Sequence, residues 1–204
     1  MPLSSQMSDL DLLGVLVGTQ AAENLLQENQ GSLYQLFSLS AVDHRVCEPA
    51  PEDGWNRVRR LLDVSRELVT RGFAESLRHR DALSSPGAVR SHLITSLSHL
   101  PHEAFVVLFL DAQNRLIASR ECFRGTLTQT SVYPREVVKI ALEYNACAVI
   151  LCHNHPSGTM EPSQADRWLT DQLKAALSLV DVKVLDHFIV AGNQTLSMAE
   201  RGLI

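Results

Sequence analysis

Cysteine, aromatic residues and long apolar runs are all scarce in this sequence, and each shortage excludes a class of protein. The four cysteines form no C-x-x-C pair and no dense disulfide pattern, which is typical of free thiols in a reducing compartment. The apolar patch at residues 10–17 is interrupted by Asp11, and the amino terminus has no basic region. We therefore expect a cytoplasmic protein without a signal peptide, a transmembrane span or a membrane partner.

An excess of positive charge is also missing, because the net charge is -5. That value argues against a protein that coats nucleic acid through bulk charge. Residues 55–80 are a local exception, with seven arginines against three acidic residues. Such a segment either is a solvated helix face or follows a phosphate backbone. No interleaved aromatic residues support base stacking, so only these arginines favour DNA as a partner.

The composition is that of an ordinary globular protein, 45% hydrophobic and 20% charged. Residues 84–87, Ser-Ser-Pro-Gly, are small, polar and turn-forming, and they mark a domain boundary. We predict a small all-helical domain over residues 1–82 and an α/β domain over residues 83–204.

The first of these domains shows helical periodicity. Ser8 can cap a helix whose apolar residues recur at three- and four-residue steps, namely Leu10, Leu13, Val17, Ala21 and Leu25. Residues 33–37 predict a second short segment, and residues 49–54 predict a loop. A third helix is expected over residues 55–71, with Gly72 as its stop. Its predicted inner stripe is Val58, Leu61, Leu62, Ser65, Leu68 and Val69.

The second domain alternates strands with helices, which predicts an α/β fold of three layers. Two apolar runs joined by a turn predict a hairpin, and Pro134 suits the first turn of a helix whose Val137, Val138, Ala141 and Leu142 face inward. The expected strands cover residues 105–110, 116–123, 147–152, 182–185 and 187–190, and the expected helices cover residues 88–97, 134–145 and 164–179. A turn at residues 192–193 follows the last strand.

One stretch of this domain carries the chemistry. The apolar strand 147–152 runs into His153-Asn154-His155-Pro156-Ser157-Gly158. Side chains alternate along a strand, so His153 and His155 point the same way and Asn154 points the other way. Cys152 then falls on the face opposite the histidines, and we interpret it as a core residue rather than a ligand.

Ser163 and Asp166 follow at the start of the next predicted helix. A Ser-x-x-Asp pair there is commonly a capping box, and an isolated His-x-His pair is commonly incidental. Together in one loop, two imidazoles and a carboxylate form a ligand set that zinc accepts, with the fourth position left to water. We therefore predict a catalytic zinc site of His153, His155 and Asp166, in which the cap also aims the carboxylate.

Other histidine-based sites do not match the residues. A zinc deaminase needs His-x-Glu with a distant Pro-Cys-x-x-Cys, and this chain has neither. A His-Glu-x-x-His helix is absent as well. The letters His-Asn-His are shared with HNH nucleases, in which these residues are dispersed rather than contiguous.

His-x-His-Pro followed by Ser163-x-x-Asp166 resembles the JAMM signature of the JAB/MPN metalloproteases, and His-Asn-His-Pro-Ser-Gly resembles their RadC branch. The resemblance covers residues 83–204 and includes the segments 103–111, 133–136, 185–190 and 200–203. It implies a three-layer α-β-α, cytidine-deaminase-like domain that cleaves amide or isopeptide bonds in a peptide or protein. It also implies that His153, His155 and Asp166 bind zinc, that Ser163 helps hold the substrate oxygen, and that Glu103 is the base.

Two assignments stay open between alternatives. Glu103 lies at the mouth of the apolar strand 105–110, but Glu121, Glu136 and Glu143 are also available as bases. His187 either hydrogen-bonds a metal ligand or is a satisfied core histidine. The polar segment 126–130 is a further candidate for the lining of the site.

The family's amino-terminal region resembles a helix-hairpin-helix module that binds DNA through backbone amides. Residues 47–53 of this chain depart from that pattern, because two prolines lack amide protons and three acidic residues repel phosphate. The alternative to an enzyme is a binding module in DNA repair or replication, with a structural or vestigial zinc site.

Overall fold

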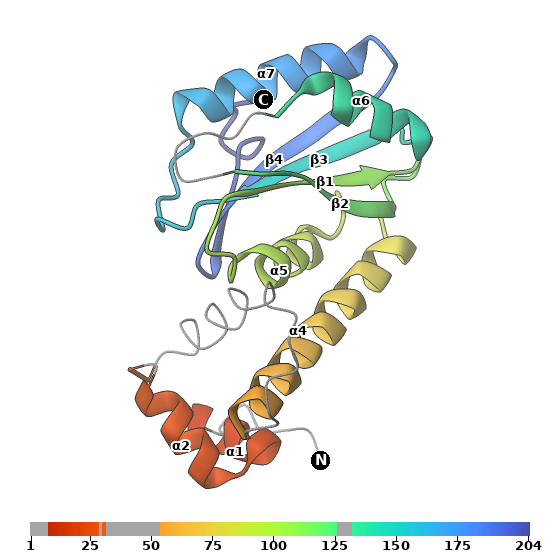
Figure 1. Ribbon diagram of the computed structural model, residues 1–204. Coiled ribbons are helices and arrows are strands. Elements are labelled where there is room, and N and C mark those ends of the chain that lie inside the picture. The colour runs from red at the N-terminus through yellow and green to blue at the C-terminus, as the bar shows by residue number, and fades with distance from the viewer. Residues whose placement is uncertain (1–7, 29, 32–53, 126–131) are drawn as a thin grey trace. The chain divides into compact units, whose positions relative to one another are not determined.

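A computed structural model describes residues 8–28, 30–31, 54–125 and 132–204 (Figure 1). The chain divides into two compact units, residues 1–68 and 69–204. The predicted domain boundary between residues 82 and 83 differs from this division and stays a prediction. The predicted segments 33–37 and 49–53 lie outside the described residues, as does the polar segment 126–130.

Residues 9–28 form two helices where the sequence predicted one. Helix α1 spans Asp9–Val17 and α2 spans Thr19–Glu28. Gly18 separates them with a φ of +86°, a left-handed conformation that ends a helix and that glycine adopts most easily. Leu13, Ala22 and Leu25 form a small core with Leu62, so the apolar periodicity is real although the helix is interrupted. Ser8 caps α1 as predicted.

Helix α4 spans Gly54–His79, so the predicted stop at Gly72 is wrong. Gly72 is not among the glycines with a positive φ, and a residue with helical dihedrals does not end a helix. The predicted inner stripe is also largely wrong, because Leu62 is buried while Leu61, Leu68 and Val69 are exposed. Leu62 joins the core of the first unit and Leu77 that of the second, so the buried side chains described on this helix belong to two separate cores.

The second unit is built on a sheet of five described strands in the order β2-β1-β3-β4-β5. The strands are β1 Ala104–Leu110, β2 Leu116–Arg124, β3 Ala148–Asn154, β4 Lys183–Ala191 and β5 Gln194–Ser197. Strands β3 and β4 are parallel, and the other neighbours are antiparallel. Every residue of β1 and β3 is buried, as their unbroken apolar runs predicted.

Helices cover both faces of this sheet, as Figure 1 shows. The side chains of successive β1 residues point alternately to the two faces of the sheet. Val106, Leu108 and Leu110 pack in one core with α5, which spans Pro86–Leu97. Phe105, Val107 and Phe109 pack in the other core with α6, Pro134–Glu143, and α7, Gln164–Ser178. The predicted mixed α/β class is confirmed. The predicted inward face of α6 is wrong at Leu142, which is exposed.

The two predicted last strands are one strand, β4. Val149 pairs with Val184, but Ile150 pairs with Asp186, so Leu185 is an extra residue in the ladder. Such a bulge keeps the strand continuous and turns the residues after it to the opposite face. The Asp186 carboxylate is satisfied there, because it accepts hydrogen bonds from the Ser197 hydroxyl and from the amides of His187 and Ala199. A polar residue that suggested a strand break therefore lies inside the strand.

No helix in the described part of the chain is long and apolar enough to cross a membrane.

Candidate metal centre

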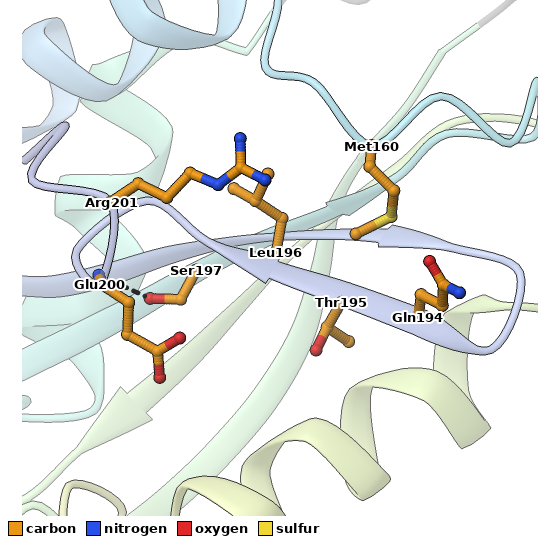
Figure 2. Close-up of a pocket in the computed structure, with 7 residues that line it drawn as sticks. All are labelled: Met160, Gln194, Thr195, Leu196, Ser197, Glu200 and Arg201. Carbon is orange, nitrogen blue, oxygen red and sulfur yellow. Dashed lines mark hydrogen bonds between the residues drawn. The ribbon is translucent and has the colours of Figure 1, made fainter.

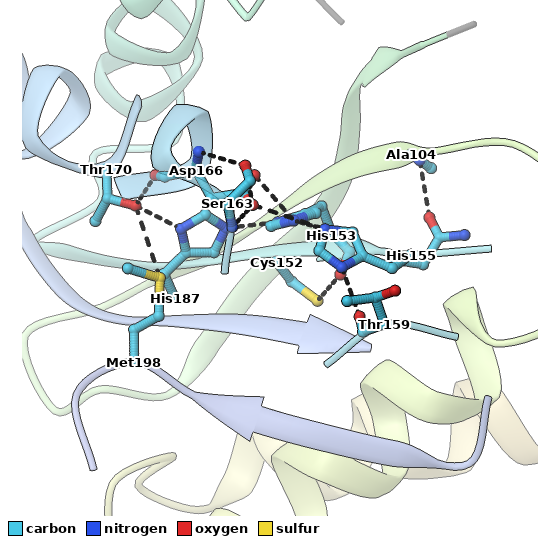
Figure 3. Close-up of polar contacts among 11 residues, drawn as sticks. Ala104, Cys152, His153, His155, Thr159, Ser163, Asp166, Thr170, His187 and Met198 are labelled. Atoms are coloured by element: carbon cyan, nitrogen blue, oxygen red, sulfur yellow. Dashed lines mark hydrogen bonds and ion pairs between the residues drawn. The ribbon is translucent and has the colours of Figure 1, made fainter. Parts of the chain in front are cut away.

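The end of β3 brings two imidazoles together. The Nε2 atoms of His153 and His155 lie 2.9 Å apart (Figure 3). Asn154 points the other way, where its side-chain oxygen accepts a hydrogen bond from the Ala104 amide. The alternation expected from the sequence is therefore present. Cys152 is fully buried in the core on the α5 side of the sheet, as its interpretation as a core residue required.

The third group comes from the first turn of α7. Asp166 Oδ1 lies 3.2 Å from Nε2 of His153, and Oδ2 lies 3.7 Å from Nε2 of His155. Ser163 forms a capping box with Asp166, because its hydroxyl accepts from the Asp166 amide at 3.1 Å and its own amide donates to Oδ2 at 2.7 Å. The hydroxyl also donates to Oδ2 at 2.6 Å. Ligand atoms of His153, His155 and Asp166 all lie within 4.8 Å of one another. The helix cap and the convergent carboxylate thus coexist.

The loop after β3 fixes the orientation of His155. Its Nδ1 lies 2.7 Å from the carbonyl oxygen of Thr159, which can only accept a hydrogen bond. Nδ1 therefore carries the proton in a neutral ring, and the Nε2 lone pair faces Asp166 and His153. Gly158 allows the loop to turn back, because its φ of +81° is strained for any residue with a side chain.

The electrostatics favour a cation between these groups. Burial alone would raise the pKa of the Asp166 carboxyl group, but its contacts with His153, His155 and Ser163 hold that pKa well below its usual range. The pKa of His155 is raised, chiefly by the Asp166 carboxylate beside it and also by the charge of Glu103. Two ring nitrogens and a carboxylate oxygen that converge in this way need a positive charge among them. Zinc suits the donor set of two imidazoles and one carboxylate.

Glu103 lies just before β1, and its charge acts on His155. The segment around it is fastened by Asn154, whose side-chain nitrogen donates to the carbonyls of Leu100 and His102 at 3.3 and 3.0 Å. The same side chain accepts from the Ala104 amide at 2.8 Å. Asn154 therefore holds the backbone on both sides of Glu103, across 50 residues of sequence.

The other three glutamates have different surroundings. Glu121 forms an ion pair with Arg124 on β2 at 2.8 Å, and Glu136 forms one with Lys139 on α6 at 3.0 Å. Glu143 is the last residue of α6. The choice among the four as base stays a prediction, and Glu103 is the one whose charge raises the pKa of His155.

His187 contacts a predicted ligand rather than only core atoms. It is fully buried, and its Nε2 lies 2.8 Å from Nδ1 of His153. Its Nδ1 lies 2.6 Å from the hydroxyl oxygen of Thr170. The ring of Phe105 stacks on His153 and meets His187 edge-on. Sequence reasoning missed Thr170, although its position one helical turn after Asp166 was a usable signal.

A pocket of about 670 Å³ lies along β5 (Figure 2). Met160, from the loop that joins His155 to Ser163, forms part of its wall with Leu196 and Arg201. None of His153, His155 and Asp166 lines it. The two ends of this loop therefore lie at the predicted metal centre, and Met160, in its middle, lines a separate pocket.

Comparison with known proteins identifies the family. The family model described as a RadC-like JAB domain matches residues 83–203. The chain belongs to the RadC-like JAB family. A UPF0758 protein of Variovorax paradoxus is 49% identical over 208 residues, which cover 98% of this chain and 91% of that protein. Another, from Nitrosospira multiformis, is 50% identical over 202 residues that cover 97% and 90%, respectively.

A third UPF0758 protein, from Dechloromonas aromatica, is 60% identical over 208 residues, covering 97% of this chain and 90% of that protein. The likeness to these relatives therefore extends well beyond the RadC-like JAB domain. Within that domain lie β3 and α7, the two elements that carry the convergent histidines and Asp166.

Proposed function

We propose that this protein is a zinc-dependent hydrolase that cleaves amide or isopeptide bonds in a peptide or protein. The observation that supports this most is the convergence of His153, His155 and Asp166 within 4.8 Å. Their side chains are 7%, 11% and 16% exposed, so the site is largely dry but reachable. Family membership supports the same reaction class.

The two imidazole Nε2 atoms and the Asp166 carboxylate would hold the metal. When bound, zinc lowers the pKa of a water molecule to about 7 and polarises a carbonyl group. Phe105, packed against the rings of His153 and His187, keeps water away from the buried side of the ligands. Low local polarity strengthens the electrostatic interactions inside such a site.

Glu103 is the proposed general base and acid. It would take a proton from the attacking water and return it to the leaving amine. Asn154 positions it by fastening Leu100, His102 and Ala104. Ser163 is the proposed donor to the substrate oxygen. Its hydroxyl donates to Asp166 Oδ2 in this structure, so it would have to turn towards the substrate.

The test compares zinc content and peptide hydrolysis in the wild type, Glu103→Gln and Asp166→Asn. We expect Glu103→Gln to keep zinc and lose about 10²- to 10⁴-fold in turnover, the usual contribution of a general base. Asp166→Asn should lose both zinc and turnover. Glu121→Gln and Glu143→Gln are matched controls that should leave both unchanged. Full activity in Glu103→Gln would remove Glu103 from the mechanism, and a wild type that binds no zinc would refute the proposal.

A role as a DNA-binding module is the second candidate function, with the zinc site structural or vestigial. Several arginines in this region are exposed: Arg60, Arg71 and Arg78 of α4, and Arg80 just after its end. Fluorescence anisotropy with duplex and forked DNA at two salt concentrations tests it. Tight binding that weakens steeply with salt would favour this candidate, and weak binding at both concentrations would refute it.

A further inference from the structure

We propose that Thr170 and His187 are positioning residues that fix the tautomer of His153, so that its Nε2 lone pair faces the metal. This inference rests on the proposed function only in taking His153, His155 and Asp166 as metal ligands. A ring that carried its proton on Nε2 would point an N–H group at the cation and could not coordinate it.

The direction of the hydrogen bonds follows from one fixed acceptor. The Thr170 hydroxyl lies 2.6 Å from the main-chain carbonyl oxygen of Asp166, one turn earlier in α7. A carbonyl oxygen has no proton to give, so the hydroxyl hydrogen is used there. The hydroxyl oxygen must therefore accept in its contact with Nδ1 of His187 at 2.6 Å. Nδ1 of His187 carries a proton.

The second step passes from His187 to His153. His187 has no exposed surface, and such burial disfavours a charged ring, so the ring is neutral. With the proton on Nδ1, its Nε2 offers a lone pair and accepts from Nδ1 of His153 at 2.8 Å. The remaining nitrogen of His153, Nε2, then presents its lone pair to Asp166 Oδ1 at 3.2 Å.

These contacts form a closed circuit that begins and ends at Asp166. Its main-chain carbonyl starts the chain through Thr170 and His187, and its carboxylate meets the last atom of the chain on His153, as Figure 3 shows. Three elements are joined, because Asp166 and Thr170 belong to α7, His187 to β4 and His153 to β3. Phe105 packs against both imidazoles and offers neither a donor nor an acceptor from its side chain.

The circuit predicts that Thr170, which does not contact the metal, controls how tightly the metal binds. Thr170→Val keeps the shape of the side chain but removes the oxygen that accepts from His187. The two His187 tautomers then become similar in energy, and one of them directs an N–H group at Nδ1 of His153. When His153 accepts that hydrogen bond at Nδ1, its own proton lies on Nε2, inside the metal centre.

The first measurement reads the tautomer directly in the metal-free protein. Long-range proton–nitrogen correlation spectra of full-length chain with ¹⁵N-labelled histidine distinguish the two protonated nitrogens. We expect His153 and His187 to be protonated at Nδ1 in the wild type and in Thr170→Ser, which keeps the hydroxyl. Thr170→Val should give a mixture of tautomers. A wild-type His153 without a proton on Nδ1 would overturn the proposal.

The second measurement is zinc affinity by competition with a chromophoric chelator. We expect Thr170→Val to weaken binding by about 10- to 100-fold, as loss of a partner of a metal-bound imidazole usually does, and Thr170→Ser to bind like the wild type. Thr95→Val is the matched control, because the Thr95 hydroxyl makes the same bond to a carbonyl one turn earlier, on α5. Equal zinc affinities in Thr170→Val and Thr170→Ser would overturn the proposal.

A further pair of variants tests the proposal if Thr170→Val fails to fold. His187→Gln can still accept from His153 and donate to Thr170, whereas His187→Leu can do neither, so only His187→Leu should lose affinity. Equal losses would overturn the proposal. Absence of peptide hydrolysis would count against the proposed function alone, because neither the tautomer nor the zinc affinity depends on turnover.

Discussion

At the scale of single residues, His153 uses each part of its ring for a different contact. Nδ1 meets His187, Nε2 faces Asp166 and His155, and one ring face lies against Phe105. Each of these partners comes from a different part of the chain, so the ring cannot rotate without breaking several contacts. A ligand held this firmly loses little conformational freedom when a metal binds.

His92 gives a prediction about pH. It is buried in α5, and burial lowers its pKa below the ordinary value of about 6.5, an effect that a backbone group of Thr70 opposes only in part. In the pH range between the folded and unfolded pKa values, the unfolded chain binds more protons. Stability is therefore lost as the pH falls through about 6.5. We expect His92→Leu to flatten this acid-side decline in urea unfolding measured from pH 8 to pH 5.

The exposed residue His79, at the end of α4, provides the control for that experiment. His79→Leu should keep the decline of the wild type. A decline in His92→Leu as steep as in the wild type would assign the acid sensitivity to other groups.

At the scale of elements, α1 and α7 begin with the same device. Ser8 and Asp11 form a capping box with distances of 2.6, 3.1 and 3.2 Å, and Ser163 and Asp166 form one with 2.6, 2.7 and 3.1 Å. Only the second box contains a predicted metal ligand. The pair therefore separates the energetic role of a cap from its role in aiming a carboxylate.

We expect Ser8→Ala and Ser163→Ala each to cost about 1 kcal/mol in the free energy of unfolding, the usual value for loss of an N-cap side chain. Ser163→Ala should also weaken zinc binding, because Oδ2 of Asp166 loses the hydroxyl that holds it. Denaturant unfolding and chelator competition measure the two effects. Equal zinc affinities in the two variants would show that the cap does not orient the ligand.

The Asn154 side chain, at the end of β3, gives a prediction about the segment that carries Glu103. Asn154→Ala leaves the Ala104 amide and the carbonyls of Leu100 and His102 without this partner, at a cost of about 1–3 kcal/mol for each group that stays buried and unpaired. We expect turnover to fall by a larger factor than zinc affinity, because Asn154 holds the segment of the proposed base and not the proposed ligands. Steady-state hydrolysis and zinc titration on the same preparation check this. Parallel losses would contradict the assignment.

At the scale of the whole molecule, metal binding should stabilise one unit and not the other. A ligand present at 100 times its dissociation constant adds about 2.7 kcal/mol to folding stability. We expect zinc to raise the unfolding temperature and a chelator to reverse the rise, with no response in Asp166→Asn. Amide exchange should slow in β3, β4 and α7 and stay unchanged in α1 and α2. Protection spread equally over both units would contradict a site confined to residues 69–204.

Much of the second unit could be predicted from the sequence, because its signals are local. The apolar runs of β1 and β3, the turn at residues 111–114 and the helix start at Ser163 are each specified within a few residues. The alternation of a strand likewise placed His153 and His155 on one face. These features need no knowledge of distant partners.

The parts that could not be predicted depend on contacts across the sequence. The end of α4 was misplaced because Gly72 resembles a helix stop when only its neighbours are considered. The roles of Thr170 and His187 follow from the meeting of α7, β4 and β3, which no local pattern encodes. The fastening of Leu100 and Ala104 by Asn154 is of the same kind.

The bulge at Leu185 makes the length of β4 as important as its composition. If Leu185 entered the ladder as an ordinary paired residue, Asp186 would pair with Leu151 and His187 would move to the α5 side, facing away from His153. One additional paired residue between Leu185 and His187 would leave every predicted ligand intact and still turn His187 away from His153. The contact between His187 and His153 therefore depends on Leu185 being left out of the ladder, as well as on the two histidines themselves.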